Sequence, residues 1–156
     1  MYVYYLSSMY LDNRLREPEA LTMCGEPIDL SRVAMPAYIF ATHDDHIVPW
    51  RSAYKSTGLL GGDLTFVLGA SGHIAGVVNP ASKNRRHYWT NEHLPGNADE
   101  WLSGAESHPG SWWPHWAAWL AEFAGTRRQA PKHAGSADYP VLGPAPGTYV
   151  VEKLTA

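Results

Sequence analysis

The chain has 156 residues, a formal net charge of −3 at pH 7 and a hydrophobic content of 45%. Such a chain is long enough to bury a core, and its charge gives no electrostatic case for binding nucleic acid or an anionic membrane surface. No apolar run approaches the ~20 residues of a membrane-spanning helix, and we expect neither a membrane segment nor a signal peptide. The single cysteine excludes an internal disulfide, which fits the cytoplasm.

The first half of the chain predicts two buried strands, each followed by a polar loop. Two short apolar runs are typical of parallel strands. A proline begins the helix expected between them, at a first-turn position that proline tolerates. In chain order the expected elements are a helix over 1–16, a hairpin over 21–30, a strand over 37–41, a helix over 49–57 and a strand over 64–68.

The second half of the chain predicts less regular structure. Residues 79–96 are polar and irregular, and we expect no strand or helix there. Two helices are expected over 98–104 and 112–124, with Pro109-Gly110 between them. Residues 126–156 contain four prolines and little periodicity, which predicts an extended tail. The order of strands, loops and helices predicts an α/β fold, the closing part of a doubly wound parallel sheet.

Asp45 and His73 are the candidate acid and base. Each follows a predicted strand at its C-terminal end, where open α/β sheets build their sites. An acid followed by a histidine matches the last two members of an α/β-hydrolase triad, in which the carboxylate orients the imidazole and the imidazole removes a proton. The alternative for Asp45 is a helix cap, although its neighbour Asp44 could perform that task. The alternative for His73 is a structural role, although nearby glycines predict an exposed loop.

Three other candidates fit acyl-transfer chemistry less well. Ser71 lies just before His73, whereas a triad nucleophile precedes the acid in the chain. Cys24 lies in the expected hairpin without a strand–elbow–helix context, which favours a packed or idle thiol. His43 and His46 are suitable metal ligands, but no second cluster of ligands matches them, so we expect no metal site.

Four tryptophans lie within residues 112–119. Helical spacing predicts that Trp112, Trp116 and Trp119 pack into the core, which leaves Trp113 exposed. The alternative is a face that binds an apolar partner.

These segments together resemble the C-terminal part of the class I polyhydroxyalkanoate synthases, also called poly(3-hydroxybutyrate) polymerases. The resemblance extends over nearly all of the 156 residues in family order, and its combination of a histidine loop with a tryptophan-rich segment is highly specific. The matching segments are residues 9–13, 21–30, 44–50, 66–76, 79–80, 88–91, 108–114 and 144–150.

The resemblance implies an α/β-hydrolase fold and the polymerisation of 3-hydroxyacyl-CoA, such as 3-hydroxybutyryl-CoA, into a polyester with release of CoA. In that family a cysteine thiolate, activated by the histidine, takes the acyl group from the thioester. His73 matches the catalytic histidine, Asp45 the catalytic aspartate and His46 a histidine beside the site with a secondary role. The family cysteine lies on a G-x-C-x-G elbow that this chain does not contain, so we expect the chain alone to be inactive.

The resemblance also implies an organisation and a set of partners. Residues 1–20 would end a cap region, 21–125 would form the C-terminal half of the hydrolase core and 126–156 the tail. The partners would be the acyl-CoA substrate, the growing polyester, its granule in the cytoplasm and a second subunit, with no cofactor. Two alternatives remain open. One is an esterase or thioesterase of the same fold, and the other is a non-catalytic module that binds a synthase or a granule through the tryptophan-rich helix and the tail.

Overall fold

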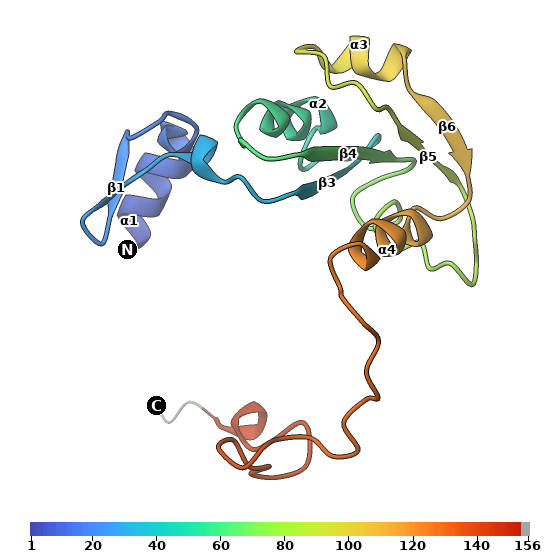
Figure 1. Ribbon diagram of the computed structural model, residues 1–156. Helices are drawn as coiled ribbons and strands as arrows, with labels where there is room; N and C mark the ends of the chain where they lie inside the picture. Colours follow the sequence, from blue (N-terminus) through green and yellow to red (C-terminus); the bar gives the residue numbers. More distant parts are fainter. Residues whose placement is uncertain (154–156) are drawn as a thin grey trace. The chain divides into compact units, whose positions relative to one another are not determined.

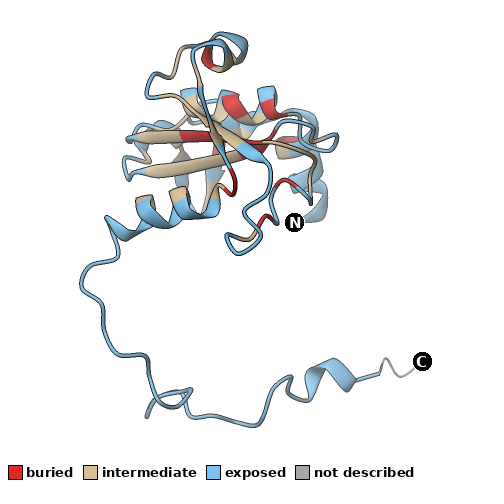
Figure 2. Ribbon diagram, turned by 90° about the vertical axis from the view of Figure 1, so that its right-hand side faces the viewer, coloured by how far each residue is buried: buried red, intermediate tan, exposed pale blue. Residues whose placement is uncertain are grey.

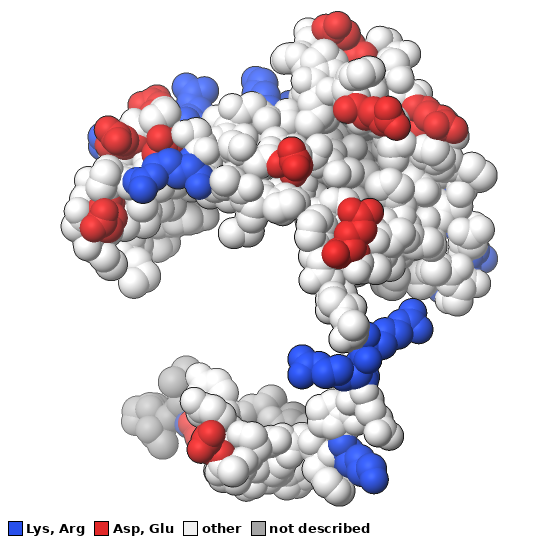
Figure 3. All heavy atoms as spheres, in the orientation of Figure 1, with Lys and Arg blue, Asp and Glu red and all other residues white. Residues whose placement is uncertain are grey.

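The computed structural model describes residues 1–153. Residues 1–122 form one compact unit, and the chain from Phe123 onward forms a second. None of the helices in residues 1–153 is long and apolar enough to cross a membrane. On the face of the first unit shown in Figure 3, acidic and basic side chains are interspersed, without a broad basic surface.

The first unit begins with a helical segment that is shorter than the sequence predicts. α1 (Tyr2–Tyr4) continues as π-helical turns over Tyr5–Leu11. Asn13 then adopts a left-handed backbone conformation with a φ of 51°, which asparagine tolerates better than most residues. A separate 3-10 turn follows over Arg14–Arg16. The expectation of one helix over 1–16 is therefore wrong at its C-terminal end.

A hairpin follows, as predicted. β1 (Leu21–Met23) pairs antiparallel with β2 (Glu26–Ile28). The two residues between the strands, Cys24 and Gly25, have φ values of 52° and 87°. A two-residue turn with positive φ at both positions matches the twist of the flanking strands. A 3-10 turn over Leu30–Arg32 then leads toward the main sheet.

The central sheet has four strands in the order β3-β4-β5-β6. β3 (Ala37–Thr42) and β4 (Leu64–Gly69) are parallel, as their apolar runs predict. β5 (His87–Thr90) and β6 (Glu106–Pro109) extend the sheet in antiparallel fashion. The expectation that residues 79–96 contain no strand is therefore wrong, and the sheet is mixed rather than wholly parallel.

Helices cover both faces of this sheet (Figure 1). α2 (Trp50–Tyr54), which continues as a 3-10 turn over Lys55–Gly58, lies with α3 (Ala98–Ser103) on one face. α4 (Trp113–Ala121) lies on the other face. The first unit thus has an α/β architecture of three layers, as the sequence predicts.

The face under α2 and α3 holds the most deeply buried side chains (Figure 2). Trp101 of α3 is 0% exposed and meets the ring of Phe66 edge to face at 4.8 Å between centroids. Such edge-to-face pairs are a favoured aromatic geometry. The cluster of buried residues consists of Ala41, Trp50, Tyr54, Phe66, Leu68 and Trp101.

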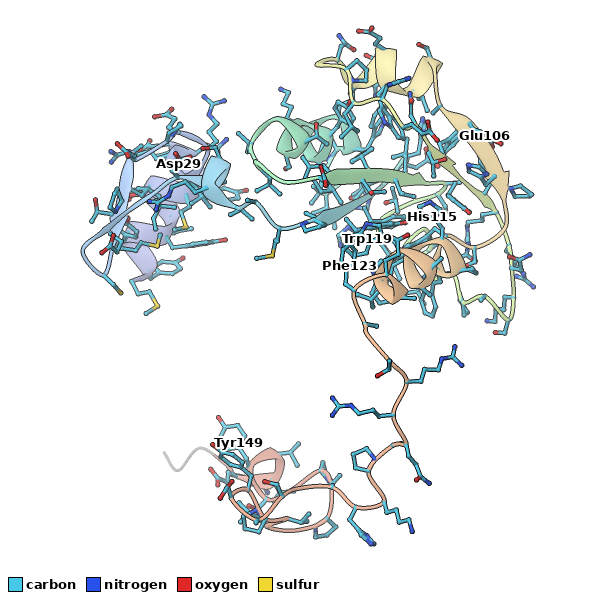
Figure 4. The ribbon with its side chains drawn as sticks, in the orientation of Figure 1. Asp29, Glu106, His115, Trp119, Phe123 and Tyr149 are labelled. Carbon is cyan, nitrogen blue, oxygen red and sulfur yellow. The ribbon has the colours of Figure 1, made fainter. Side chains whose placement is uncertain are left out.

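The face under α4 contains aromatic and polar groups together. Trp112, just before α4, stacks on Phe40 of β3 with ring centroids 3.8 Å apart. His115 and Trp119 of α4 point toward the sheet (Figure 4), where both contact Tyr38. Trp116 is 41% exposed. The expectation that Trp116 packs into the core is therefore wrong. His115 instead faces the sheet, where its Nδ1 lies 2.9 Å from the hydroxyl of Tyr38.

The second unit has little regular structure. Its described residues, 123–153, are all exposed. A 3-10 turn over Tyr149–Val151 is the one helical element among them. An extended course of this kind is what the prolines and the absence of periodicity predict.

Candidate active site

Two loops begin side by side at one edge of the parallel strand pair. In the register of β3 and β4, Thr42 lies opposite Gly69, and each is the last residue of its strand. The backbone continues the pairing briefly, since the amide of His43 donates to the carbonyl of Gly69 at 2.8 Å. Side chains that are distant in sequence therefore meet at the carboxyl ends of the strands, where α/β sheets carry their sites.

Asp45 is held firmly in the first of these loops. Its Oδ1 accepts hydrogen bonds from the amides of Ile47 (2.8 Å) and Val48 (2.9 Å), and its Oδ2 lies 2.8 Å from Nδ1 of His73. These bonds, led by that from the Val48 amide, lower the pKa of Asp45 from 3.8 to about 2. Near neutral pH the side chain is therefore a carboxylate.

The charge of Asp45 determines which ring nitrogen of His73 carries the proton. A carboxylate can only accept hydrogen bonds, so Nδ1 of His73 is the donor in this pair. In the neutral imidazole, Nε2 then carries the free lone pair. The His73 side chain is 42% exposed and that of Asp45 is 9% exposed. The pair thus consists of an accessible base and an enclosed acid that orients it.

Asp44, which could have capped the following helix, does not do so. Oδ1 of Asp44 instead pairs with Nδ1 of its neighbour His43 at 2.7 Å. Asp45 does not cap the helix either, since α2 begins at Trp50 without a side-chain cap; its Oδ1 instead accepts the amides of Ile47 and Val48 within the loop, while its Oδ2 faces His73. One carboxylate thus shapes its own loop and also orients the imidazole.

Two hollows adjoin His73. One of about 440 Å³ is lined by His46, Ile47 and Ile74 among others, so His46 lies beside the candidate base. The other, of about 230 Å³, is lined by Thr42 and Asp45 among others. His73 contributes to both. A substrate atom could therefore reach the imidazole from either side.

The other sequence candidates lie in different surroundings. Ser71 has a φ of 79°, and its carbonyl accepts the amide of Asp44 at 3.0 Å, so its backbone shapes the turn before His73. Cys24 is exposed at the hairpin turn. Within residues 1–153 no three His, Cys, Asp or Glu side chains converge to hold a metal ion. A hollow of about 500 Å³ in the tail, lined by residues 142–149, contains no carboxylate or imidazole.

Trp113 is exposed, as expected from the sequence, and its indole Nε1 donates to the carbonyl of Val77 at 2.9 Å. Val77 follows His73 in the second loop. Helical spacing indicates only which way Trp113 faces, so no signal in the sequence could have identified this contact.

Comparison with known proteins identifies the relatives of the chain. It is 55% identical over 152 residues to the poly(3-hydroxyalkanoate) polymerase subunit PhaC of Cupriavidus necator, a match that covers 97% of this chain and 26% of that protein. The chain is homologous to the poly(3-hydroxyalkanoate) polymerases. This finding confirms the family resemblance seen in the sequence.

Further polymerases match over the same extent. Poly(3-hydroxyalkanoate) polymerase 1 of Ectopseudomonas oleovorans is 42% identical over 95% of this chain and 26% of its own length. The polymerase of Methylorubrum extorquens is 39% identical over 96% of this chain and 25% of its own length. No family model matches the chain. The chain thus spans about a quarter of the length of these curated relatives.

Proposed function

We propose that Asp45 and His73 are the acid and the base of an enzyme that polymerises 3-hydroxyacyl units, delivered as CoA thioesters, into a polyester. The observation that carries this proposal is the 2.8 Å hydrogen bond between Nδ1 of His73 and Oδ2 of Asp45 in a chain homologous to poly(3-hydroxyalkanoate) polymerases. An oriented imidazole with a free Nε2 is what activation of a thiol or a hydroxyl requires.

The proposed reaction has two acyl transfers. Nε2 of His73 takes the proton of a cysteine thiol, and the thiolate attacks the carbonyl carbon of the acyl-CoA thioester. The bond from carbon to the CoA sulfur breaks, and CoA leaves with the proton from His73. The 3-hydroxyl of another unit then gives its proton to His73 and attacks the acyl-cysteine. An ester bond forms, and the thiol regains its proton from the imidazole.

The nucleophilic thiol in this proposal comes from a cysteine outside the present sequence. Cys24, which lies at an exposed hairpin turn, has no strand–elbow–helix surroundings. We therefore propose that this chain alone is inactive and contributes one part of a Cys-His-Asp triad. In the same proposal residues 1–20 end a cap region, 21–125 form part of an α/β-hydrolase core and 126–156 form a tail.

We also propose the partners and the location of this enzyme. The substrate is a 3-hydroxyacyl-CoA, and the product chain remains at the surface of a polyester granule in the cytoplasm, where the complete enzyme acts as a homodimer. His46, which lines the same hollow as His73, would lie beside the bound acyl group.

A chimeric polymerase tests this function. In it, the present chain replaces the matching stretch of the Cupriavidus necator polymerase, which is 55% identical over 152 residues. We expect the chimera to release CoA from 3-hydroxybutyryl-CoA and to form polyester, and we expect His73→Ala to abolish both. His93→Ala, which removes an exposed histidine at a distance from Asp45 in the chain, is the control. CoA release by the His73→Ala chimera at the rate of this control would contradict the proposal.

The same assay separates an esterase or thioesterase from a polymerase. A hydrolase would release CoA together with free 3-hydroxy acid, whereas the proposed enzyme releases CoA together with insoluble polyester. Analysis of the acyl product therefore decides between the two acyl-transfer functions.

A non-catalytic binding module is the second candidate, and one observation favours it. An apolar hollow of about 230 Å³ is lined by Val77, Val78 and three tryptophans, of which Trp113 and Trp116 are 37% and 41% exposed. Exposed apolar surface of this kind can serve binding. Sedimentation of the isolated chain with polyester granules, lost in a Trp116→Ala variant but retained in His73→Ala, would support this second function.

A further inference from the structure

The loop that carries His73 contains a short helical turn with acceptor groups at its end. The amide of Gly76 donates to the carbonyl of Gly72 at 2.7 Å, and that of Val78 donates to the carbonyl of Ile74 at 2.8 Å. Carbonyls in the last turn of a helical segment lack partners within the segment. The carbonyl of Val77 accepts the amide of Asn79 at 3.0 Å, and a carbonyl oxygen has a second lone pair for a further donor.

Two indole groups from the start of α4 donate to carbonyls at the end of this turn. Nε1 of Trp112 donates to the carbonyl of Gly76 at 3.2 Å, and Nε1 of Trp113 donates to the carbonyl of Val77 at 2.9 Å. The two acceptors are successive residues of the loop, and the two donors are successive residues of the sequence. These two hydrogen bonds hold the end of the turn in one position relative to the start of α4.

The residues that make the contact are themselves fixed by the sheet. Trp112 stacks on Phe40 of β3 at 3.8 Å between ring centroids. Ser111, which is 3% exposed, donates its hydroxyl to a further carbonyl of the same loop. Because β3 also leads into the turn that contains Asp45, one strand positions both the carboxylate and the tryptophans that hold the loop of His73.

At Gly76 the loop packs closely against the end of β3. A Cβ atom on Gly76 would lie 2.5 Å from Cγ2 of Thr42 and 2.8 Å from the carbonyl oxygen of Ala70. The turn therefore contacts the end of β3 at Gly76 and the two indoles at Gly76 and Val77. A displacement of its end would be transmitted to the imidazole a few residues earlier.

We propose that Trp113, together with Trp112, is a positioning residue for His73, an inference that rests on the function proposed above. The N–H of Trp113 holds the carbonyl of Val77 and so keeps Nδ1 of His73 within reach of Asp45. Trp113 is 37% exposed, and its ring also meets that of Trp112 edge to face with centroids 6.4 Å apart. The positioning role belongs to the N–H group of this indole.

Trp113→Phe tests the proposal, because it retains an aromatic ring and removes the N–H. Trp116→Phe is the matched control. Trp116 is 41% exposed and lines the same apolar hollow, and the structure of residues 1–153 gives its indole no hydrogen-bond acceptor. Both variants are made in the full 156-residue chain, where the geometry is tested without any need for enzyme activity.

The first readout is the Hδ1 proton of His73 in NMR spectra of chain labelled with ¹⁵N-histidine. We expect a downfield, slowly exchanging signal in the parent and in Trp116→Phe. In Trp113→Phe we expect exchange with water to be about tenfold faster, which corresponds to the loss of one hydrogen bond. An unchanged signal in Trp113→Phe would overturn the proposal, as would an equal change in both variants.

The second readout is kinetic and uses the chimeric polymerase. We expect Trp113→Phe to lower kcat about tenfold or more while KM stays within about twofold, because misplacement of a reacting group affects the transition state rather than binding. His93→Ala, the control used for the chimera above, should leave kcat unchanged. A change in KM alone would contradict a positioning role.

The two readouts separate this inference from the proposed function. A chimera that makes no polyester, together with the expected NMR difference, refutes the function and leaves the positioning of His73 supported. Should Trp113→Phe fail to fold, nuclear Overhauser contacts between the indole proton of Trp113 and Val77 in the parent chain decide the matter, and their absence overturns the proposal.

Discussion

The two faces of the central sheet are stabilised in different ways. Under α2 and α3, aromatic rings pack with little hydrogen bonding, and the buried Nε1 atoms of Trp50 and Trp101 have no partner within residues 1–153. Under α4, by contrast, the indoles of Trp112 and Trp113 donate to loop carbonyls. The first face can tolerate unpaired donors because burial of large rings outweighs them.

The difference indicates a division of tasks. Contacts without directional bonds hold the layers together but do not fix a loop in one register, whereas hydrogen bonds do. The α4 face adds a further polar contact, since the hydroxyl of Tyr38 lies 2.9 Å from Nδ1 of His115. We infer that the α2–α3 face maintains the fold and that the α4 face maintains the geometry around His73.

Trp101→Ala should have the largest effect on stability. The residue is 0% exposed and contacts Trp50, Tyr54 and Phe66. Removal of such a ring leaves a cavity and costs about 3–5 kcal/mol. Chemical denaturation followed by circular dichroism measures the loss. A loss below about 1 kcal/mol would show that this face is not the main source of stability.

Gly76→Ala should have an intermediate effect that is concentrated near His73. The new methyl group would collide with the side chain of Thr42 and with the Ala70 carbonyl. Crowding of this kind costs about 1–3 kcal/mol. We also expect the NMR signal of the His73 Hδ1 proton to be lost. Gly96→Ala, at a position where a Cβ meets nothing within 4 Å, is the control.

Acidification should loosen the α4 face through His115, with a smaller effect. Burial, and to a lesser degree the neighbouring His108, lowers the pKa of His115 below 6.5. The unfolded chain then binds a proton more readily than the folded chain, so stability falls as the pH decreases below about 6.5. Tyr38 and Tyr88 also face this imidazole.

Denaturation curves at pH 7.5 and pH 5.5 measure this dependence, with His115→Gln as the variant. Glutamine does not titrate, so the difference between the two pH values should be smaller than in the parent by the contribution of His115. His133→Gln, in the exposed tail, should retain the full difference. An equal reduction in both variants would assign the pH dependence to some other group.

The sequence could predict those strands and helices that a short run of neighbouring residues is enough to indicate. Apolar runs identify β3 and β4, and a buried parallel pair places the residues after them together. For this reason the proximity of Asp45 and His73 could be expected from chain order alone, and the structure places their side chains 2.8 Å apart.

Strands β5 and β6 could not be predicted, because their signals are not local. β6 has the sequence Glu106-Ser107-His108-Pro109, which contains no apolar run. It is the last strand of the sheet, an edge position where polar residues and a terminal proline are tolerated. β5 pairs with both β4 and β6, and such pairings depend on partners distant in sequence.

The orientation of α4 shows a second limit of sequence reasoning. The sets 112, 116, 119 and 112, 115, 119 both fit a helical period, and hydrophobicity favours Trp116 over His115. The structure selects His115, since Tyr38 offers it a hydrogen-bond partner on the opposing strand. A polar partner across the layer can thus outweigh the hydrophobic pattern within one helix.

The central claim is that Asp45, and not its neighbour, orients the base. The most direct measurement is CoA release by chimeric polymerases that carry Asp45→Asn or Asp44→Asn. Because Asp45 bonds to His73 while Asp44 bonds to His43, we expect kcat to fall about 10²–10⁴-fold in Asp45→Asn and to change less than about twofold in Asp44→Asn. Equal activity in the two variants would contradict the account.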